Sequence, residues 1–236
     1  MTEAEWLACG APMKLLEHVG GTALDRKRRL LGCGLGRHVW PVLRDARSRT
    51  AIEVAERFAD GAATDDEREA AEADAQAVMK KARKYNRNRN RYECFGTAVG
   101  AWAAGTEVRH WGVGDDAAAD PAGGPARDTP VWEDAAEAMY SDGAGWHGEL
   151  GWFCDVIRCV FGNQYRHATF NPRSSRKKAV AFAQAIYDER AFDRLPALAD
   201  ILQEMGYEDP AVLAHCRSAG PHVRGCWVVD LVLGKS

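Results

Sequence analysis

The segment SRKKAVAFAQAIYDERAFDRLPALADILQEMG, residues 175–206, decides the fold class of this chain. Its apolar side chains recur every three or four positions, first along residues 175–190 and again after Asp193. This spacing places them on one face of an α-helix, and two such faces in succession bury against each other. The apolar positions are Val180, Ala183, Ile186 and Tyr187 in the first helix, and Leu195, Leu198, Ala199, Leu202 and Met205 in the second. The segment therefore predicts a pair of packed helices.

The same periodicity occurs in two other parts of the chain. One helix is predicted to start near Asp45 and to carry an apolar face as far as Phe58, and another is predicted to end before Gly162. Alternating β-branched residues around Asn-Gly turns, which would indicate strands and hairpins, do not occur. The sequence predicts an all-α fold, an irregular multi-helix bundle.

Residues that start and stop helices support this fold class. Thr2 with Glu5, and Thr64 with Glu67, have the spacing of the capping box, in which hydroxyl and carboxylate bond free backbone N–H groups. We expect Asp193 to cap the second helix of the opening segment, within a salt-bridged junction. Further starts are predicted at Asp209-Pro210 and Thr129-Pro130, and stops at Gly162, Gly206 and Gly234.

A stretch rich in Gly, Pro, Ala and Asp interrupts the helical pattern at residues 112–128. Few large apolar side chains occur there, so burial would not offset the entropy lost on ordering, and we expect a flexible central loop. The predicted organisation is an N-terminal helical part (1–106), a flexible linker or loop (107–128) and a C-terminal helical part (129–236). We expect the two helical parts to pack together as one globular unit.

Composition narrows the class of protein. The 236 residues are 46% hydrophobic and 28% charged, with a formal net charge of −3, which are ordinary globular values. The N-terminal segment carries acidic residues where a secretory signal is basic, and the most apolar run, residues 226–233, is too short to cross a membrane. Seven cysteines without a C-x-x-C pair indicate reduced thiols rather than a disulfide framework. We expect a cytoplasmic protein without a membrane partner.

Several strings of residues resemble a family of planctomycete proteins to which no activity is assigned. They include MTEAEWLAC at residues 1–9, AIEVAERFADG at 51–61, AIYDERAFDR at 185–194, HCR at 215–217 and GPHVRGCWVVD at 220–230. The resemblance covers most of the chain outside residues 62–152 and implies no function. The family tends to carry a cysteine-rich string where this chain has Gly-Cys-Gly-Leu-Gly, residues 32–36, so that Cys33 alone remains.

The densest group of metal-ligating residues lies near the C-terminal end of the sequence. If Pro221 starts a helix, His222 and Cys226 are four positions apart and project from one face, as two zinc ligands would. The other ligands would be His215 or Cys216, with Cys33 brought in by folding. Two alternatives stay open. Ordinary burial of the thiols in the core is the interpretation that the sequence favours over a metal site, and a Cys/His nucleophile system with Asp230 or Asp188 orienting the imidazole is the other.

Two further features suggest macromolecular partners. A basic run at residues 80–91 includes Lys84, Arg87, Arg89 and Arg91, interleaved with tyrosine, and such residues contact single-stranded RNA. A solvated charged face explains this run better, so a nucleic-acid partner is not expected. Five of the eight tryptophans lie in the region 102–152, where aromatic side chains would anchor a protein partner.

The sequence thus predicts a non-enzymatic protein-interaction or scaffold module, because no pattern of catalytic residues is recognisable. A zinc-stabilised structural protein is the alternative, followed by a Cys/His-dependent enzyme and an RNA-binding protein. No catalytic residue is assigned, and we expect no cofactor, with a zinc ion as the alternative.

Overall fold

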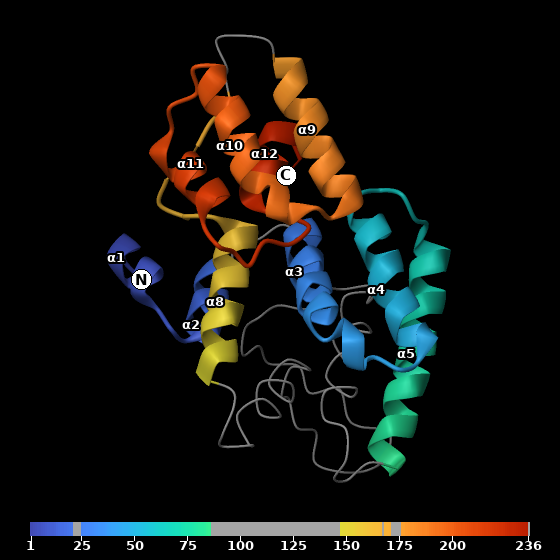
Figure 1. Ribbon diagram of the computed structural model, residues 1–236. Coiled ribbons are helices and arrows are strands. Elements are labelled where there is room, and N and C mark those ends of the chain that lie inside the picture. The colour runs from blue at the N-terminus through green and yellow to red at the C-terminus, as the bar shows by residue number, and fades with distance from the viewer. Residues whose placement is uncertain (21–24, 86–146, 167, 171–175, 236) are drawn as a thin grey trace. The chain divides into compact units, whose positions relative to one another are not determined.

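A computed structural model describes residues 1–20, 25–85, 147–166, 168–170 and 176–235 (Figure 1). In these ranges the chain forms helices and no strand, which confirms the all-α prediction. The predicted flexible loop at residues 112–128 and the helix start at Thr129 lie outside the described residues. The α-helices are α1 (Glu3–Ala8), α2 (Pro12–Gly20), α3 (Asp25–His38), α4 (Ala46–Ala59), α5 (Asp65–Tyr85), α8 (His147–Phe161), α9 (Arg176–Glu189), α10 (Leu195–Glu204), α11 (Pro210–Arg217) and α12 (Trp227–Leu233). Short 3-10 helices occupy Trp40–Val42 (η1) and Phe192–Arg194 (η2).

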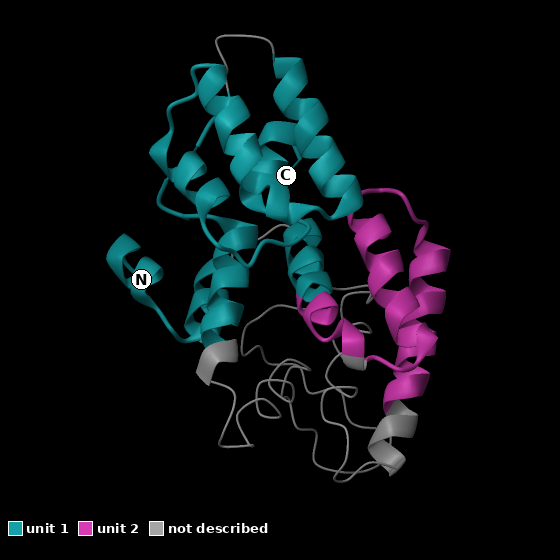
Figure 2. Cartoon of the chain, in the orientation of Figure 1, with its two compact units in different colours: residues 1–34, 148–236 teal, residues 35–147 magenta. Residues whose placement is uncertain are grey.

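The chain divides into two units, shown in Figure 2. Unit 1 combines residues 1–34 with residues 148–236, and unit 2 consists of residues 35–147. This division differs from the one predicted from the sequence, whose linker at residues 107–128 is outside the described ranges. The first 34 residues belong with the C-terminal helices because helix α3 and the C-terminal segment bury apolar residues together and share ion pairs.

The core of unit 1 is built on the helix pair that the opening segment predicted. Helix α9 packs against α10 and α12, and α10 packs against α11 (Figure 1). The predicted apolar positions Ala183, Ile186, Leu195, Leu198 and Leu202 are all fully buried. Burial of such side chains stabilises the folded state by about 1.5–3 kcal/mol each for the larger ones, before the entropy of ordering them is subtracted.

The predicted helix boundaries are confirmed where they depend on local chemistry. Thr2 and Glu5 exchange both hydrogen bonds of a capping box, and Asp209 accepts bonds from the first backbone N–H groups of α11. Gly206 and Gly234 follow α10 and α12 with positive φ angles of 77° and 70°. These are left-handed conformations that favour glycine.

The predicted cap at Asp193 is wrong. Asp193 lies inside η2, and α10 begins at Leu195 with Arg194 as its N-cap and no side-chain capping bond. The chain reverses direction through Arg190, whose φ of 53° is left-handed, and η2 then supplies the first turn toward α10. The predicted salt bridge at this junction is present between Arg194 and Glu189, at 3.1 Å.

Helix α3 is tied to α12 by a buried carboxylate. The Asp230 side chain is 2% exposed, and it accepts hydrogen bonds from Arg26 Nη1 at 2.8 Å and from Lys27 Nζ at 2.5 Å. Lys27 also donates to the backbone oxygen of Gly225, just before α12. A Cβ on Gly225 would come within 2.9 Å of Leu30 Cβ, so this glycine permits the close approach of the two segments.

Helix α8 is joined to α1 by Arg158. Its guanidinium donates to the backbone oxygens of Trp6 and Cys9 at the end of α1, where helix carbonyls have no partner within the helix. The Trp6 ring is 1% exposed and fixes α1 to unit 1.

Unit 2 contains a pair of packed helices, α4 and α5. The second predicted capping box, Thr64 with Glu67, opens α5 as expected. Glu56 of α4 is 1% exposed and receives two hydrogen bonds from Arg37, at 3.0 and 2.7 Å. This bidentate pair satisfies a carboxylate that would be costly to bury alone.

Within the described residues, no helix combines the length and apolar character required to cross a membrane.

Candidate metal centre

Four side chains in unit 1 bring their ligand atoms together in the core. They come from the last turn of α8, the last turn of α11, the segment between α11 and α12, and the residue that precedes α12. They are Cys159, His215, His222 and Cys226.

The distances between these atoms approach those of one coordination sphere. One atom from each residue lies within 4.8 Å of the other three. Cys159 Sγ is 3.8 Å from His222 Nδ1, and His215 Nε2 is 3.3 Å from Cys226 Sγ. Tetrahedral bonds of about 2.0–2.3 Å place neighbouring ligand atoms about 3.3–3.8 Å apart. The four residues could therefore hold a metal ion after small side-chain movements.

Contacts with Ser218 orient the His222 ring. Its Nε2 lies 3.3 Å from the backbone oxygen of Ser218 and 3.4 Å from the Ser218 hydroxyl. An N–H at Nε2 that donates to the Ser218 carbonyl leaves Nδ1 unprotonated and directed at Cys159. Metal-bound imidazoles commonly hold their other nitrogen in this way, and the bond fixes the tautomer.

Burial makes the cluster a closed site. Cys159 and Cys226 are 1% and 0% exposed, and the two imidazoles are half-buried. The His215 and His222 rings meet edge to face, with centroids 4.8 Å apart. No open position for a substrate is left among the four ligands, as in structural rather than catalytic metal sites.

The electrostatics of the cluster favour a thiolate at Cys226. Burial alone would raise the pKa of Cys226, but hydrogen bonds from Cys159, His215 and His222 and the positive charge of His215 lower it well below the usual range. Burial, together with the neighbouring Cys226 sulfur, raises the pKa of Cys159 well above its usual range. Burial pushes the pKa of His222 down, but bonding to Cys226 and Ser218 outweighs it and the pKa is raised. These directions favour a thiolate at Cys226 beside imidazole, which a cation would stabilise.

Local packing explains how Cys159 reaches the cluster. Helix α8 ends at Gly162, whose φ is 68°, and a Cβ there would lie 3.0 Å from Trp227 Cγ. The absent side chain lets the start of α12 pack against the end of α8. Cys159, one turn earlier, is thereby placed beside Cys226.

The structure brings together three of the five residues named from the sequence: His215, His222 and Cys226. Cys33 is fully buried in α3 and is not in the cluster, and neither is Cys216, which faces the core of unit 1. Burial raises the pKa of the Cys216 thiol to about 12, so it is held neutral. Adjacent residues on a helix point about 100° apart. His215 and Cys216 therefore do not both reach the same centre.

Sequence reasoning missed Cys159. It lies 56 positions before His215 and within a strongly apolar helix, so nothing local distinguishes it from a core cysteine. Its place beside the apolar positions Val156 and Val160, just before the stop at Gly162, predicts burial but no ligand role.

The helix expected from Pro221 is also absent. Residues 219–226 form an irregular segment with a turn at Arg224 and Gly225, and α12 starts at Trp227. His222 and Cys226 nevertheless converge, because Cys226 N donates to Val223 O at 2.9 Å and closes the turn between them.

The Cys/His nucleophile system receives no support from the geometry. The hydrogen bonds of His215 and His222 go to cysteine sulfur and to Ser218, rather than to a carboxylate. The two proposed orienting groups are engaged elsewhere, Asp230 by Lys27 and Asp188 by Gln184.

The residues named for nucleic-acid contact lie beyond what the structure describes. Arg87, Arg89 and Arg91 follow α5, and Lys84 is within α5 but its side chain is not described. The tryptophan-rich region 102–152 falls outside as well, except for Trp152 on α8.

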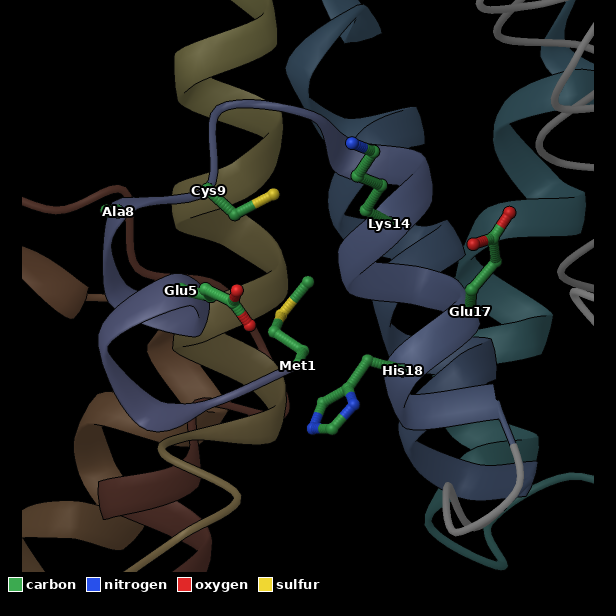
Figure 3. A pocket seen from close by; sticks show the side chains of 7 residues that line it. All are labelled: Met1, Glu5, Ala8, Cys9, Lys14, Glu17 and His18. Atoms are coloured by element: carbon green, nitrogen blue, oxygen red, sulfur yellow. The ribbon is translucent and has the colours of Figure 1, made fainter.

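A separate open hollow of about 720 Å³ lies between α1 and α2 (Figure 3). Its lining mixes acidic, basic and apolar side chains, namely those of Met1, Glu5, Ala8, Cys9, Lys14, Glu17 and His18. None of the four clustered residues lines it, so the hollow and the candidate metal centre are distinct.

Comparison with protein-family models, with curated proteins and with solved structures finds no match to this chain.

Proposed function

We propose that this chain is a zinc-stabilised structural protein in which one Zn²⁺ is held by Cys159, His215, His222 and Cys226. The observation that carries the proposal is the convergence of two sulfur and two imidazole nitrogen atoms within 4.8 Å, at a buried junction of three segments.

The ligand chemistry favours zinc. Thiolate and imidazole are soft and borderline ligands that suit Zn²⁺, and two of each give a common structural set. Two thiolates and two neutral imidazoles also cancel the charge of a divalent ion. A neutral centre avoids most of the cost of burying charge.

The place of the cluster supports a structural role. Helices α11 and α12 have eight and seven residues, and helices of that length are marginal without tertiary contacts. A metal ion would cross-link both helices to α8. Because the site forms only in the folded chain, binding free energy becomes folding free energy. Free zinc at about 100 times its dissociation constant would add about 2.7 kcal/mol to stability.

Metal analysis and cobalt substitution test the proposal on the full-length protein. We expect one zinc per chain, and Co²⁺ in its place should show the visible absorption of a tetrahedral site with sulfur ligands. Cys159→Ser and Cys226→Ser should each reduce metal affinity by at least about 100-fold, because each removes a ligand rather than a second-shell contact. A chelator should lower the melting temperature of the wild type.

Cys216→Ala and Cys33→Ala provide matched controls, since both thiols are buried in unit 1 but lie outside the cluster. Both variants should keep one metal per chain. If no metal binds, or if Cys33→Ala loses the metal while Cys159→Ser keeps it, the proposed site is wrong.

The broader prediction of an interaction or scaffold module is compatible with a structural metal. It remains a proposal, because the tryptophan-rich region on which it depends is outside the described residues.

A further inference from the structure

The sulfur atoms of Cys159 and Cys226 are neighbours in the core. They lie within 4.8 Å of each other. Both cysteines are free in the structure. A disulfide bond has an S–S length of about 2 Å, so the two atoms must approach by less than about 3 Å to form one.

The segment that carries Cys226 can supply this movement. Residues 218–226 form no helix, and Cys226 is the residue just before α12 rather than part of it. Cys159, by contrast, is fixed within α8. A shift of the irregular segment toward α8 would close the gap without breaking either helix.

Cys159 and Cys226 are at most 1% exposed, and the sulfur of each contacts one of the two half-buried imidazoles. An oxidant therefore reaches the sulfurs after the ring of His215 or His222 moves aside. A bound metal would hold both rings in place through the same nitrogen atoms. Access to the thiols thus depends on whether the site is loaded.

We propose that Cys159 and Cys226 form a reversible disulfide in the metal-free chain, so that oxidation by a peroxide controls metal binding. This inference rests on the proposed metal site and adds its regulation.

The reaction balances for hydrogen peroxide. The two thiols give up two protons and two electrons and form the S–S bond, while the O–O bond of the peroxide breaks and two water molecules leave. From the zinc-bound dithiolate the same oxidation releases Zn²⁺, and the two protons come from solvent. A thiol reductant reverses the change: two reductant thiols give two electrons and two protons to the S–S bond and are themselves joined as a disulfide, after which both protein sulfurs can bind metal again.

The test compares zinc-loaded and metal-free full-length protein exposed to hydrogen peroxide. Thiols are alkylated, and peptide mass spectrometry under non-reducing conditions identifies the linked cysteines. We expect a Cys159–Cys226 disulfide in the metal-free protein. With free zinc at about 100 times its dissociation constant only about 1% of chains are metal-free, so the reaction should slow about 100-fold. Zinc release, followed with an indicator dye, should match disulfide formation one to one.

Cys216→Ala is the matched control, because Cys216 is buried beside the cluster and its pKa responds to the charge of Cys226. This variant should form the disulfide as the wild type does, whereas Cys159→Ala should not. A reductant should restore one equivalent of zinc binding to the oxidised wild type.

The inference is overturned if Cys226 links to Cys216, if pairing is random because the metal-free chain has unfolded, or if the thiols reach sulfinic acid without pairing. In those cases zinc binding by the reduced protein is intact and the proposed function stands. If the reduced protein never binds zinc, the proposed function fails regardless of which cysteines pair.

Discussion

Replacing Asp230 by Asn should destabilise the protein strongly, because this carboxylate joins α3 to α12. It is 2% exposed, and it accepts bonds from Arg26 at 2.8 and 3.2 Å and from Lys27 at 2.5 Å. Asn keeps the shape but removes the charge and turns one acceptor into a donor that faces two cations.

Breaking a buried ion pair by removing one partner costs about 3–5 kcal/mol. Arg26 and Lys27 are 15% and 14% exposed and can regain some hydration, so we expect the lower end, about 3 kcal/mol. That is a large share of a total stability of about 5–15 kcal/mol. Urea unfolding followed by circular dichroism, at fixed free zinc, measures the change.

Glu204→Gln is the control, because it removes an ion pair with Lys178 in which both side chains are more than 60% exposed. Such a pair contributes about 0–1 kcal/mol, so this variant should unfold close to the wild type. If Asp230→Asn loses no more stability than Glu204→Gln, the buried pair does not hold α3 and α12 together and the reasoning is refuted.

Two further predictions concern the contacts beside the site and at α1. Gly225→Ala should lower stability and zinc affinity more than Gly206→Ala does. Both glycines have a positive φ, but only at Gly225 would a Cβ clash with Leu30. Urea unfolding measures the stability and zinc competition the affinity, and equal losses in the two variants would contradict the prediction. Hydrogen bonds from Arg166 and from the side-chain amide of Asn163 lower the pKa of Glu3 below 4.5. The contribution of Glu3 to the stability of α1 is therefore complete above pH 4.5, and it is lost as the pH falls through the lower pKa of the folded state. Hydrogen exchange of residues 3–8, corrected for intrinsic rates, should rise over that range in the wild type and change little in Glu3→Gln; an unchanged wild-type profile would exclude this role.

The helices could be predicted because their signals are local. A capping box such as Thr2 with Glu5 needs only residues three positions apart, and both predicted boxes form. The predicted cap at Asp193 was wrong because it, too, was inferred from local sequence alone. Its role depended on how the chain leaves α9, and the left-handed turn at Arg190 shifted the start of α10 to Leu195.

The candidate site was partly predictable because three ligands lie within twelve residues of sequence. Cys33 was named because it is the one cysteine that remains where the resembling family is cysteine-rich, and we expected folding to bring its helix, α3, to the C-terminal segment. It does so, but through Gly34, where a Cβ would lie 3.3 Å from Val223. Because the backbone at Gly34 packs against Val223, the side chain of the preceding residue, Cys33, points to a different side of α3. Cys159 takes the fourth place because of tertiary packing at Gly162, which no local pattern encodes.

The sequence left open whether these cysteines are metal ligands or ordinary core residues. The two interpretations differ in the charge on sulfur, because a metal ligand is a thiolate and a core cysteine is a neutral thiol. Cys159, Cys216 and Cys226 all belong to the buried core of unit 1, so burial alone does not separate them. Cys216, with its raised pKa, is a neutral thiol that core packing fully accounts for. Cys226 is different, because its neighbours lower its pKa and favour a thiolate beside imidazole. A buried charge pair of this kind costs free energy to desolvate, and apolar packing does not offset that cost. A divalent cation among the same four atoms would convert the pair into a neutral centre, so at this position packing and the proposed metal binding would favour the same arrangement.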